Sequence, residues 1–365
     1  MKALLVGDMS PTYITDPLFA QKQTDALFHD VRELFAGNDV NFVNLECALT
    51  EHDGNIEKFG PPLKACAATA DTLRELGVTV CGLSNNHIFD YGKKGALDTI
   101  AHLERVGLDY TGFGENYGDS RKNYTVEKNG ERICMLAVCE HEYSYALENR
   151  MGSRPYDEYD TMADIRAARP DCDRLIVIYH GGKEMCQYPS PRLFKLCRAM
   201  VDNGADVVLC QHSHCIGCYE QYKDGHILYG QGNFHFVKPK FLVESEKEKW
   251  DTSLAVKYDT ETNAIEFVPL HVFGDGIEIA KGEVAARIMD GFASRNEELA
   301  SGAWRGKWHD FCMGVKAQYI KVLAEAFAPG STKRQDDNFG HYLDCEAHAD
   351  VFREICPTAN HTNEI

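Results

Sequence analysis

The sequence predicts an α/β protein in which buried strands alternate with helices, followed by a helical C-terminal extension. Between residues 3 and 107, short apolar runs alternate three times with stretches of helical spacing. Each of these apolar runs ends in polar residues of a kind that can bind a metal or a substrate. Beyond about residue 280 the apolar residues follow a helical spacing instead.

The first part of the chain is interpreted as three β-α units. Glycines 77 and 107 follow the second and third predicted helices, as expected of residues that end a helix in a left-handed conformation. A polar, glycine-containing loop is expected over 51–62. The predicted elements are, in order, a strand at 3–7, a helix within 21–36, a strand at 40–45, a helix at 65–76, a strand at 78–83 and a helix at 96–106.

The rest of the chain continues the alternation and then changes character. A hairpin is expected within 124–138, a loop over 140–154 and a charged loop or short helix over 238–250. The other predicted elements are helices at 159–168 and 191–203, strands at 174–179, 205–210, 226–229 and 254–258, and helical segments at 281–300 and 312–328. We therefore divide the chain into a domain over 1–275 and a helical extension over 276–365.

Composition excludes several classes of protein. The net charge of -18 argues against nucleic-acid binding, which needs a basic surface, but not against an anionic substrate, because a bound metal can dominate the local field. No export signal and no apolar stretch of membrane-spanning length is visible, so we expect a cytoplasmic protein without a transmembrane segment. Most of the 14 cysteines stand singly in apolar stretches, as reduced buried thiols do. Cys215 and Cys218 form a C-x-x-C for which redox or metal chemistry is the alternative.

Candidate metal ligands collect at the ends of the predicted strands. His212 and His214 directly follow the strand at 205–210, and both can reach one point if the chain turns there. Taken one at a time, such residues have ordinary explanations: a helix cap for Asp8, a surface charge for Glu46 or a turn for Asn86. These explanations would have to hold at five strand ends together. The whole set is Asp8, Glu46, Asn86, His87, His180, His212 and His214.

This set predicts a two-metal site. Parallel strands place their carboxyl ends at one edge of a sheet, where ligand sites of α/β proteins lie. Two carboxylates, an amide oxygen and several imidazoles match the ligands of a pair of divalent cations, with one carboxylate between them.

The motifs in this order resemble the CapA family of poly-γ-glutamate capsule biosynthesis proteins, whose fold is the layered α/β sandwich of the calcineurin-like metallophosphoesterases. The resemblance covers residues 4 to about 236. It rests on Gly7-Asp8, Asn44-Leu45-Glu46, Ser84-Asn85-Asn86-His87-x-x-Asp90-x-Gly92, His180-Gly181-Gly182-x-Glu184, Gly204-Ala205-Asp206-x-Val208-x-x-x-His212-x-His214, Glu220-x-Tyr222 and Gly232-Asn233-Phe234.

The resemblance implies roles for these residues. Asp8 and His214 would hold one metal, Asn86, His180 and His212 would hold the other, and Glu46 would lie between them. His87 would be the acid beside the leaving group, and Asn85, Glu184 and Asn233 would contact the substrate. The metals would be two divalent ions such as Mn, Fe or Zn. Two departures from the pattern are visible: Ser10 stands where the first strand normally carries a histidine, and Glu46 replaces an aspartate. The first site is therefore one ligand short unless another residue, such as Glu184, completes it.

Three functions are compatible with this set of residues. The first is a metal-dependent hydrolase acting on a phosphoester, with a small or polymeric anionic substrate. The second keeps the metals and cleaves a γ-glutamyl or other amide bond. The third is a non-catalytic accessory protein of capsule polymer synthesis. The loop tyrosines Tyr143, Tyr145, Tyr156 and Tyr188 could line a pocket for a sugar or nucleotide, although tyrosines are also common in cores.

Overall fold

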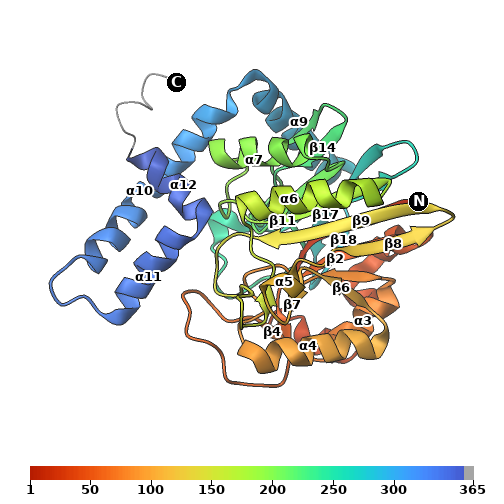
Figure 1. The fold of residues 1–365 in the computed structure, drawn as a ribbon, viewed down its shortest axis with the longest axis horizontal. Helices are drawn as coiled ribbons and strands as arrows, with labels where there is room; N and C mark the ends of the chain where they lie inside the picture. The colour runs from red at the N-terminus through yellow and green to blue at the C-terminus, as the bar shows by residue number, and fades with distance from the viewer. Residues whose placement is uncertain (357–365) are drawn as a thin grey trace.

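Two β-sheets packed face to face between layers of helices form the computed structural model, which describes residues 1–356 (Figure 1). The larger sheet has eight strands. Its central strands are parallel, whereas β16 runs antiparallel to β1 and β15 extends the same side of β1 at its carboxyl end. The order is β18 (Gly276–Ile279), β17 (Ala264–Phe273), β16 (Thr252–Asp259), β1 (Lys2–Met9), β2 (Val40–Leu45), β5 (Val80–Gly82) and β6 (Asp109–Thr111), with β15 (Asn233–His235) beside β1.

The smaller sheet has six strands, four of them parallel and an antiparallel strand at each edge. Their order is β13 (Tyr219–Tyr222), β14 (Gly225–Leu228), β12 (Val207–Gln211), β11 (Arg174–His180), β9 (Glu131–Cys139) and β8 (Tyr124–Lys128). Short pairs join β3 (Ala48–Leu49) to β4 (Lys64–Ala65) and β7 (Phe113–Gly114) to β10 (Gly152–Ser153).

The hydrophobic residues form one core between the sheets and one on each outer face. Phe42 of the larger sheet and Ile178 of the smaller sheet belong to the central core. The outer face of the larger sheet is covered by the N-terminal helices, and that of the smaller sheet by two later helices, α6 and α7 (Figure 1). The helices are α1 (Asp16–Ala20), α2 (Thr24–Phe28), α3 (Ala68–Leu76), α4 (Gly92–Val106), α5 (Tyr117–Ser120), α6 (Glu158–Ala168), α7 (Pro191–Asp202) and α8 (Lys247–Trp250), with 3-10 turns at His29–Phe35, Arg169–Asp171 and Glu244–Glu246. This α-β-β-α layering confirms the predicted layered α/β sandwich.

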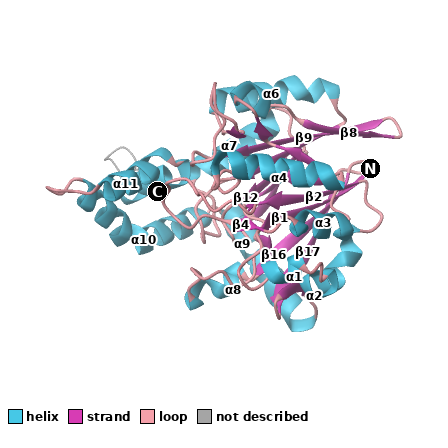
Figure 2. Cartoon of the chain, turned by 90° about the horizontal axis from the view of Figure 1, so that it is seen from below, coloured by secondary structure: helices cyan, strands magenta, loops and turns pink. Residues whose placement is uncertain are grey.

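The C-terminal helices are α9 (Gly282–Ser301), α10 (Trp304–Ala326), α11 (Lys333–Asp344) and α12 (Glu346–Ile355). α9 packs on the sandwich, because Ile288 and Phe292 belong to the core between the sheets. α10 to α12 share a separate core around Trp308 and Tyr319, and Figure 2 shows α10 and α11 extending to one side of the sheets. β18 lies just beyond residue 275 and still belongs to the larger sheet, so the helices begin at Gly282; residues 357–365 lie outside the described part.

Local details differ from the sequence prediction at several places, and β13, β15, β17 and β18 lie where no strand was predicted. The single helix expected within 21–36 is divided, because His29 has a left-handed φ of 37° between α2 and the 3-10 turn that follows. The polar segment after Pro329 contains two further helices, α11 and α12, which the spacing of apolar residues did not indicate. No helix within residues 1–356 has the length and apolar character needed to cross a membrane.

Candidate metal centre

The carboxyl ends of strands from both sheets meet at one place and bring the predicted ligands together. Asp8 of β1 is paired with Asn44 of β2 and with Asn233 of β15. His180 ends β11, and His212 and His214 follow β12, its parallel neighbour. The site is therefore assembled where the two sheets of the sandwich face each other.

Two groups of potential metal ligands form there and share one carboxylate. Glu46, His180 and His212 make one group, and Asp8, Glu46 and His214 make the other, with all ligand atoms of a group within 4.8 Å of one another. The amide oxygen of Asn86 lies 2.9 Å from His180 Nε2, next to the first group. This division is the same as the one implied by the family resemblance.

The backbone around the ligands is shaped for this arrangement. His212 and His214 both have left-handed backbones, with φ of 78° and 52°, so the His-x-His segment turns instead of continuing β12. Asp8 Oδ2 accepts a hydrogen bond from the His212 backbone N–H at 2.8 Å, and Asp8 Oδ1 accepts one from Asn44 Nδ2 at 2.7 Å. The strain of two left-handed histidines is thus offset by contacts that tie the turn to β1.

Residues behind His214 hold its ring in place. Nδ1 of His214 lies 2.8 Å from the side-chain oxygen of Asn233, whose amide group donates to the Trp250 carbonyl at 3.1 Å. The Trp250 ring lies over His214 with a centroid distance of 4.5 Å. Because Nδ1 has this partner, Nε2 is the nitrogen that can face an ion.

Several polar atoms at the centre are of the kind that a divalent cation would bind. Both carboxylate oxygens of Glu46 and Nδ1 of His212 are buried and have no hydrogen-bond partner among the described residues. Unpartnered buried polar atoms are costly, and oxygen and imidazole ligands together suit Mn, Fe or Zn. The site is therefore compatible with divalent metal ions.

The charges of the centre act strongly on one another. Burial would lower the pKa of His180, yet Glu46 and Asp8 beside it raise that pKa to about 10. Burial would raise the pKa of Asp8, but His180 and His214 bring it to about 2. Burial and the neighbouring His180 hold the pKa of His212 well below its usual value. At neutral pH the metal-free centre thus carries a proton on His180 and none on Asp8.

His87 is oriented by two residues whose roles the sequence did not reveal. Its Nδ1 lies 2.7 Å from Asp90 Oδ2, and Lys58 Nζ lies 2.5 Å from Asp90 Oδ1 and 3.3 Å from His87 Nδ1. Burial would raise the pKa of Asp90, but His87 and Lys58 hold it below its usual value. The i, i+3 spacing of His87 and Asp90 was a visible signal for this pair, whereas nothing in the polar loop over 51–62 distinguished Lys58.

The predicted substrate residues lie in different surroundings. Asn85 is buried, donates to the Leu45 carbonyl and accepts from the backbone N–H groups of His87 and Ile88, so its hydrogen bonds serve the loop itself. Asn233 supports His214, as described above. Glu184 belongs to neither ligand group, and 48% of its side chain is exposed.

Several other residues singled out in the sequence have clear positions. Ser10 is fully buried and its Oγ has no hydrogen-bond partner among the described residues. The group around Asp8 consists of three potential ligands, and Ser10 is not one of them. Cys215 and Cys218 are buried free thiols. Of the four loop tyrosines, Tyr143 lines a cavity beside the centre, between α11 and the loops of residues 55–59 and 141–143.

The C-terminal helices also reach this cavity, which sequence reasoning missed. His341 of α11 lies 3.3 Å from Glu142 through Nδ1. Burial lowers the pKa of His341 to about 4 and raises that of Glu142 to about 8, so this contact joins two largely neutral groups at pH 7. The sequence held no signal for it, because His341 is nearly 200 residues from Glu142 and outside every motif.

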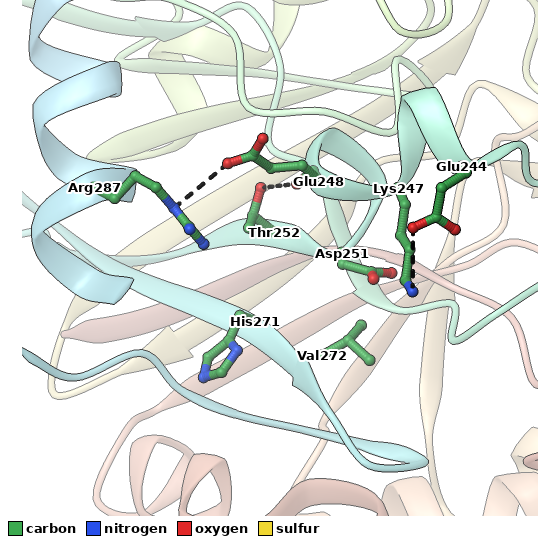
Figure 3. A pocket seen from close by; sticks show the side chains of 8 residues that line it. All are labelled: Glu244, Lys247, Glu248, Asp251, Thr252, His271, Val272 and Arg287. Carbon is green, nitrogen blue, oxygen red and sulfur yellow. Dashed lines mark hydrogen bonds and ion pairs between the residues drawn. The ribbon is translucent and has the colours of Figure 1, made fainter. Parts of the chain in front are cut away.

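Another hollow of about 450 Å³ lies between α8, β16, β17 and α9 (Figure 3). Its charged side chains are largely paired, with Arg287 lying 3.4 Å from Glu248 and Lys247 lying 3.9 Å from Glu244. None of the predicted site residues lines it. The candidate metal centre and the hollow of Figure 3 are therefore separate features.

The sequence comparisons establish the family. The model of the bacterial capsule synthesis protein PGA_cap matches residues 2–238, which include every predicted ligand, and the chain belongs to this family. It is 31% identical to the capsule biosynthesis protein CapA of Bacillus anthracis over 73% of this chain and 66% of that protein. It is 30% identical to the PGA biosynthesis protein CapA of Bacillus subtilis over 65% of this chain and 63% of that protein. The match thus spans just under two thirds of the length of these relatives.

Solved structures with a similar chain path include a phosphatase from Mycoplasma pneumoniae, with 15% identity, a TM-score of 0.46 and coverage of 74% of this chain and 92% of that one. The NAD nucleotidase of Haemophilus influenzae matches with 11% identity, a TM-score of 0.44 and coverage of 84% and 67%. The resemblance to the CapA family inferred from the motifs is confirmed by the family match and these relatives.

Proposed function

We propose that this protein is a metal-dependent hydrolase that cleaves a phosphoester. The observation that carries the proposal is the pair of buried ligand groups that share Glu46. In one group Asp8 and His214 would hold an ion, and in the other Asn86, His180 and His212 would hold a second, with Glu46 between them. Two such ions would ionise a water and stabilise the attacking and leaving oxygens of an in-line displacement.

The protein's own residues would orient His87 and protonate the leaving oxygen. Asp90 engages Nδ1 of His87, which leaves Nε2 free to give a proton to the leaving oxygen. Lys58, whose side chain is only 3% exposed, fixes Asp90 from the other side and keeps its carboxylate charged. Removing one proton donor of this kind typically costs about 10²–10⁴-fold in rate.

The first test is elemental analysis of the wild type and of His212→Ala, both purified without chelator. About two equivalents of Mn, Fe or Zn in the wild type, and fewer in His212→Ala, would support the paired site. A panel of phosphate monoesters and diesters then tests turnover, with His87→Ala expected to lose it. His102→Ala, on the outer helix α4, is the matched control. Full activity in His87→Ala at equal folding and metal content would contradict the proposed role.

A second candidate is a role in capsule polymer synthesis without phosphoester cleavage. It is favoured by the names of the relatives, which concern capsule and PGA biosynthesis, and by Ser10, which leaves the group around Asp8 with three ligands. The metal-loaded protein should then bind a γ-glutamyl oligomer, and release of glutamate would identify an amide hydrolase. One equivalent of metal and no cleavage of either substrate class would favour an accessory protein.

A further inference from the structure

A large cavity beside the centre has one wall made by the C-terminal helices, outside the part of the chain that the family model matches. Its volume is about 760 Å³, and it lies between the loop of residues 55–59, the loop of residues 141–143 and α11. Lys333 of α11 lies 3.2 Å from Glu57, which joins the two sides. In Figure 1 the orange loop after β3 and the blue α11 lie on the same side of the sheets.

The cavity adjoins the proposed reacting groups. Lys58 lines it and places Nζ 3.3 Å from His87 Nδ1 and 3.2 Å from the Asn86 carbonyl oxygen. Lys58 therefore lies between the cavity and the Nδ1 side of the His87 ring, whereas His87 itself does not line the cavity.

Aromatic rings form part of the wall. His341 is nearly parallel to Tyr143, with centroids 5.5 Å apart and planes at 21°, and to Phe59, with centroids 6.0 Å apart and planes at 28°. The Phe59 backbone N–H donates to the Tyr143 hydroxyl at 2.9 Å, which joins the two loops. The exposed 37% of Phe59 offers an apolar surface to a ligand.

The charged lining selects against a polyanion in this cavity. Four carboxylates line it against three Lys or Arg side chains, and burial raises the pKa of a fifth carboxyl group, Glu142, so that it is largely neutral at pH 7. The carboxylates are Glu57, Asp336, Asp337 and Asp344, and the cations are Lys58, Lys333 and Arg334. Lys58 lies at the inner end, beside His87, where a cationic group would be repelled. The wall thus offers both hydrogen-bond donors and acceptors next to aromatic surface, which suits a neutral group rich in hydroxyls.

We propose that this cavity binds the sugar ring of a sugar phosphate whose phosphate lies at the metal centre. The proposal rests on the phosphoester hydrolysis proposed above and names its leaving group. A water molecule gives up one proton as its oxygen bonds to phosphorus, and the bond from phosphorus to the sugar oxygen breaks. His87 gives its proton to the sugar oxygen, and the proton released by the water restores His87 through the solvent. The products are the free sugar and inorganic phosphate, and no oxidant or reductant is needed.

The experiment compares glucose 6-phosphate with methyl phosphate, which has the phosphate but no ring. The wild type should show at least a roughly tenfold lower KM for the sugar phosphate, a modest gain for one ring packed on an aromatic wall. Phe59→Ala and His341→Ala should remove most of this difference and leave KM for methyl phosphate unchanged. Tyr13→Ala, at an exposed aromatic residue of another hollow, is the matched control. Equal KM values in the wild type, or equal losses on both esters, would overturn the proposal.

A binding measurement separates this proposal from the proposed function. Calorimetry on the metal-loaded protein compares glucose 6-phosphate with inorganic phosphate. If no ester of the monoester and diester panel is cleaved, phosphoester hydrolysis fails as the function. Tighter binding of the sugar phosphate that Phe59→Ala removes would still support the cavity as a sugar site. Cleavage of methyl phosphate with no preference for the sugar phosphate in rate or binding would overturn the cavity assignment alone.

Discussion

Replacing Arg192 by methionine would remove the cation that joins the C-terminal helices to the loop after His180. Arg192 donates to Glu140 Oε1 at 2.5 Å and to Asp350 Oδ2 of α12 at 2.8 Å. Glu140 is 2% exposed, and its Oε2 accepts the backbone N–H of Gly182 at 3.0 Å. The bridge therefore reaches within two residues of a proposed metal ligand.

The loss in free energy of unfolding depends on the partners that Asp350 and Glu140 keep once Arg192 is replaced. Asp350 keeps Ser190 and Arg353 as partners, whereas Glu140 loses its only ion-pair partner among the described residues. Breaking a buried pair by removing one partner costs about 3–5 kcal/mol, and the lower end applies here because Glu140 can take up a proton. For a chain of this length, about 3 kcal/mol lowers Tm by roughly 4 °C.

The pH dependence gives this prediction a second readout. Burial already raises the pKa of Glu140 with Arg192 present, and without Arg192 the pKa rises further. The folded variant then binds a proton that the unfolded chain releases above about pH 4.5, so its stability falls as the pH rises from there. The deficit relative to wild type should be larger at pH 8 than at pH 5.

Thermal and denaturant unfolding at both pH values provide the assay. Arg74→Met, at an exposed arginine of α3, is the control and should change the free energy of unfolding by less than about 0.5 kcal/mol. A loss below about 1 kcal/mol at pH 8, or one that does not depend on pH, would refute the reasoning for Arg192.

Three further predictions follow from the centre and its surroundings. Burial would lower the pKa of His180, but its carboxylate neighbours raise it to about 10, so metal uptake at pH 7 should release about one proton from this residue. The apparent metal affinity should then rise up to tenfold per pH unit between about pH 6 and pH 9. Calorimetry in buffers of different ionisation enthalpy measures the proton release, and its absence would contradict the prediction. Gly7→Ala should lower the free energy of unfolding by about 1–3 kcal/mol and weaken metal binding, because a Cβ there overlaps a backbone carbonyl oxygen beside β15. Gly306→Ala in α10, with open space around it, should raise the free energy of unfolding by about 0.4–1 kcal/mol. Unfolding curves that rank the two variants the other way would refute this. Asp90→Asn should lower kcat at unchanged metal content, since His87 loses the carboxylate at Nδ1; unchanged pH–rate profiles would argue against that pairing.

Much of the order of elements in the sandwich could be predicted from local patterns, although β13, β15, β17 and β18 were not. Buried strands appear as continuous apolar runs, and the polar residues at their ends stand out because parallel strands must place those ends at one edge. Asp8, Glu46, His180, His212 and His214 could therefore be named as candidate ligands without knowing which strands pair, and the structure brings them together. Their division into two groups around Glu46 follows from the pairing of β1 with β2 and of β11 with β12.

The sequence by itself determined the layered α/β architecture and the candidate ligands, because both depend on local patterns of residues in short stretches of the chain. Only the tertiary structure decided what surrounds those ligands. Lys58 and His341 come from a loop and a helix with no motif and no predicted apolar period. Packing between distant segments brings Lys58 to His87 and His341 to Glu142 in the cavity beside the centre. Contacts of this kind depend on the summed burial of whole elements, which no local pattern of residues records.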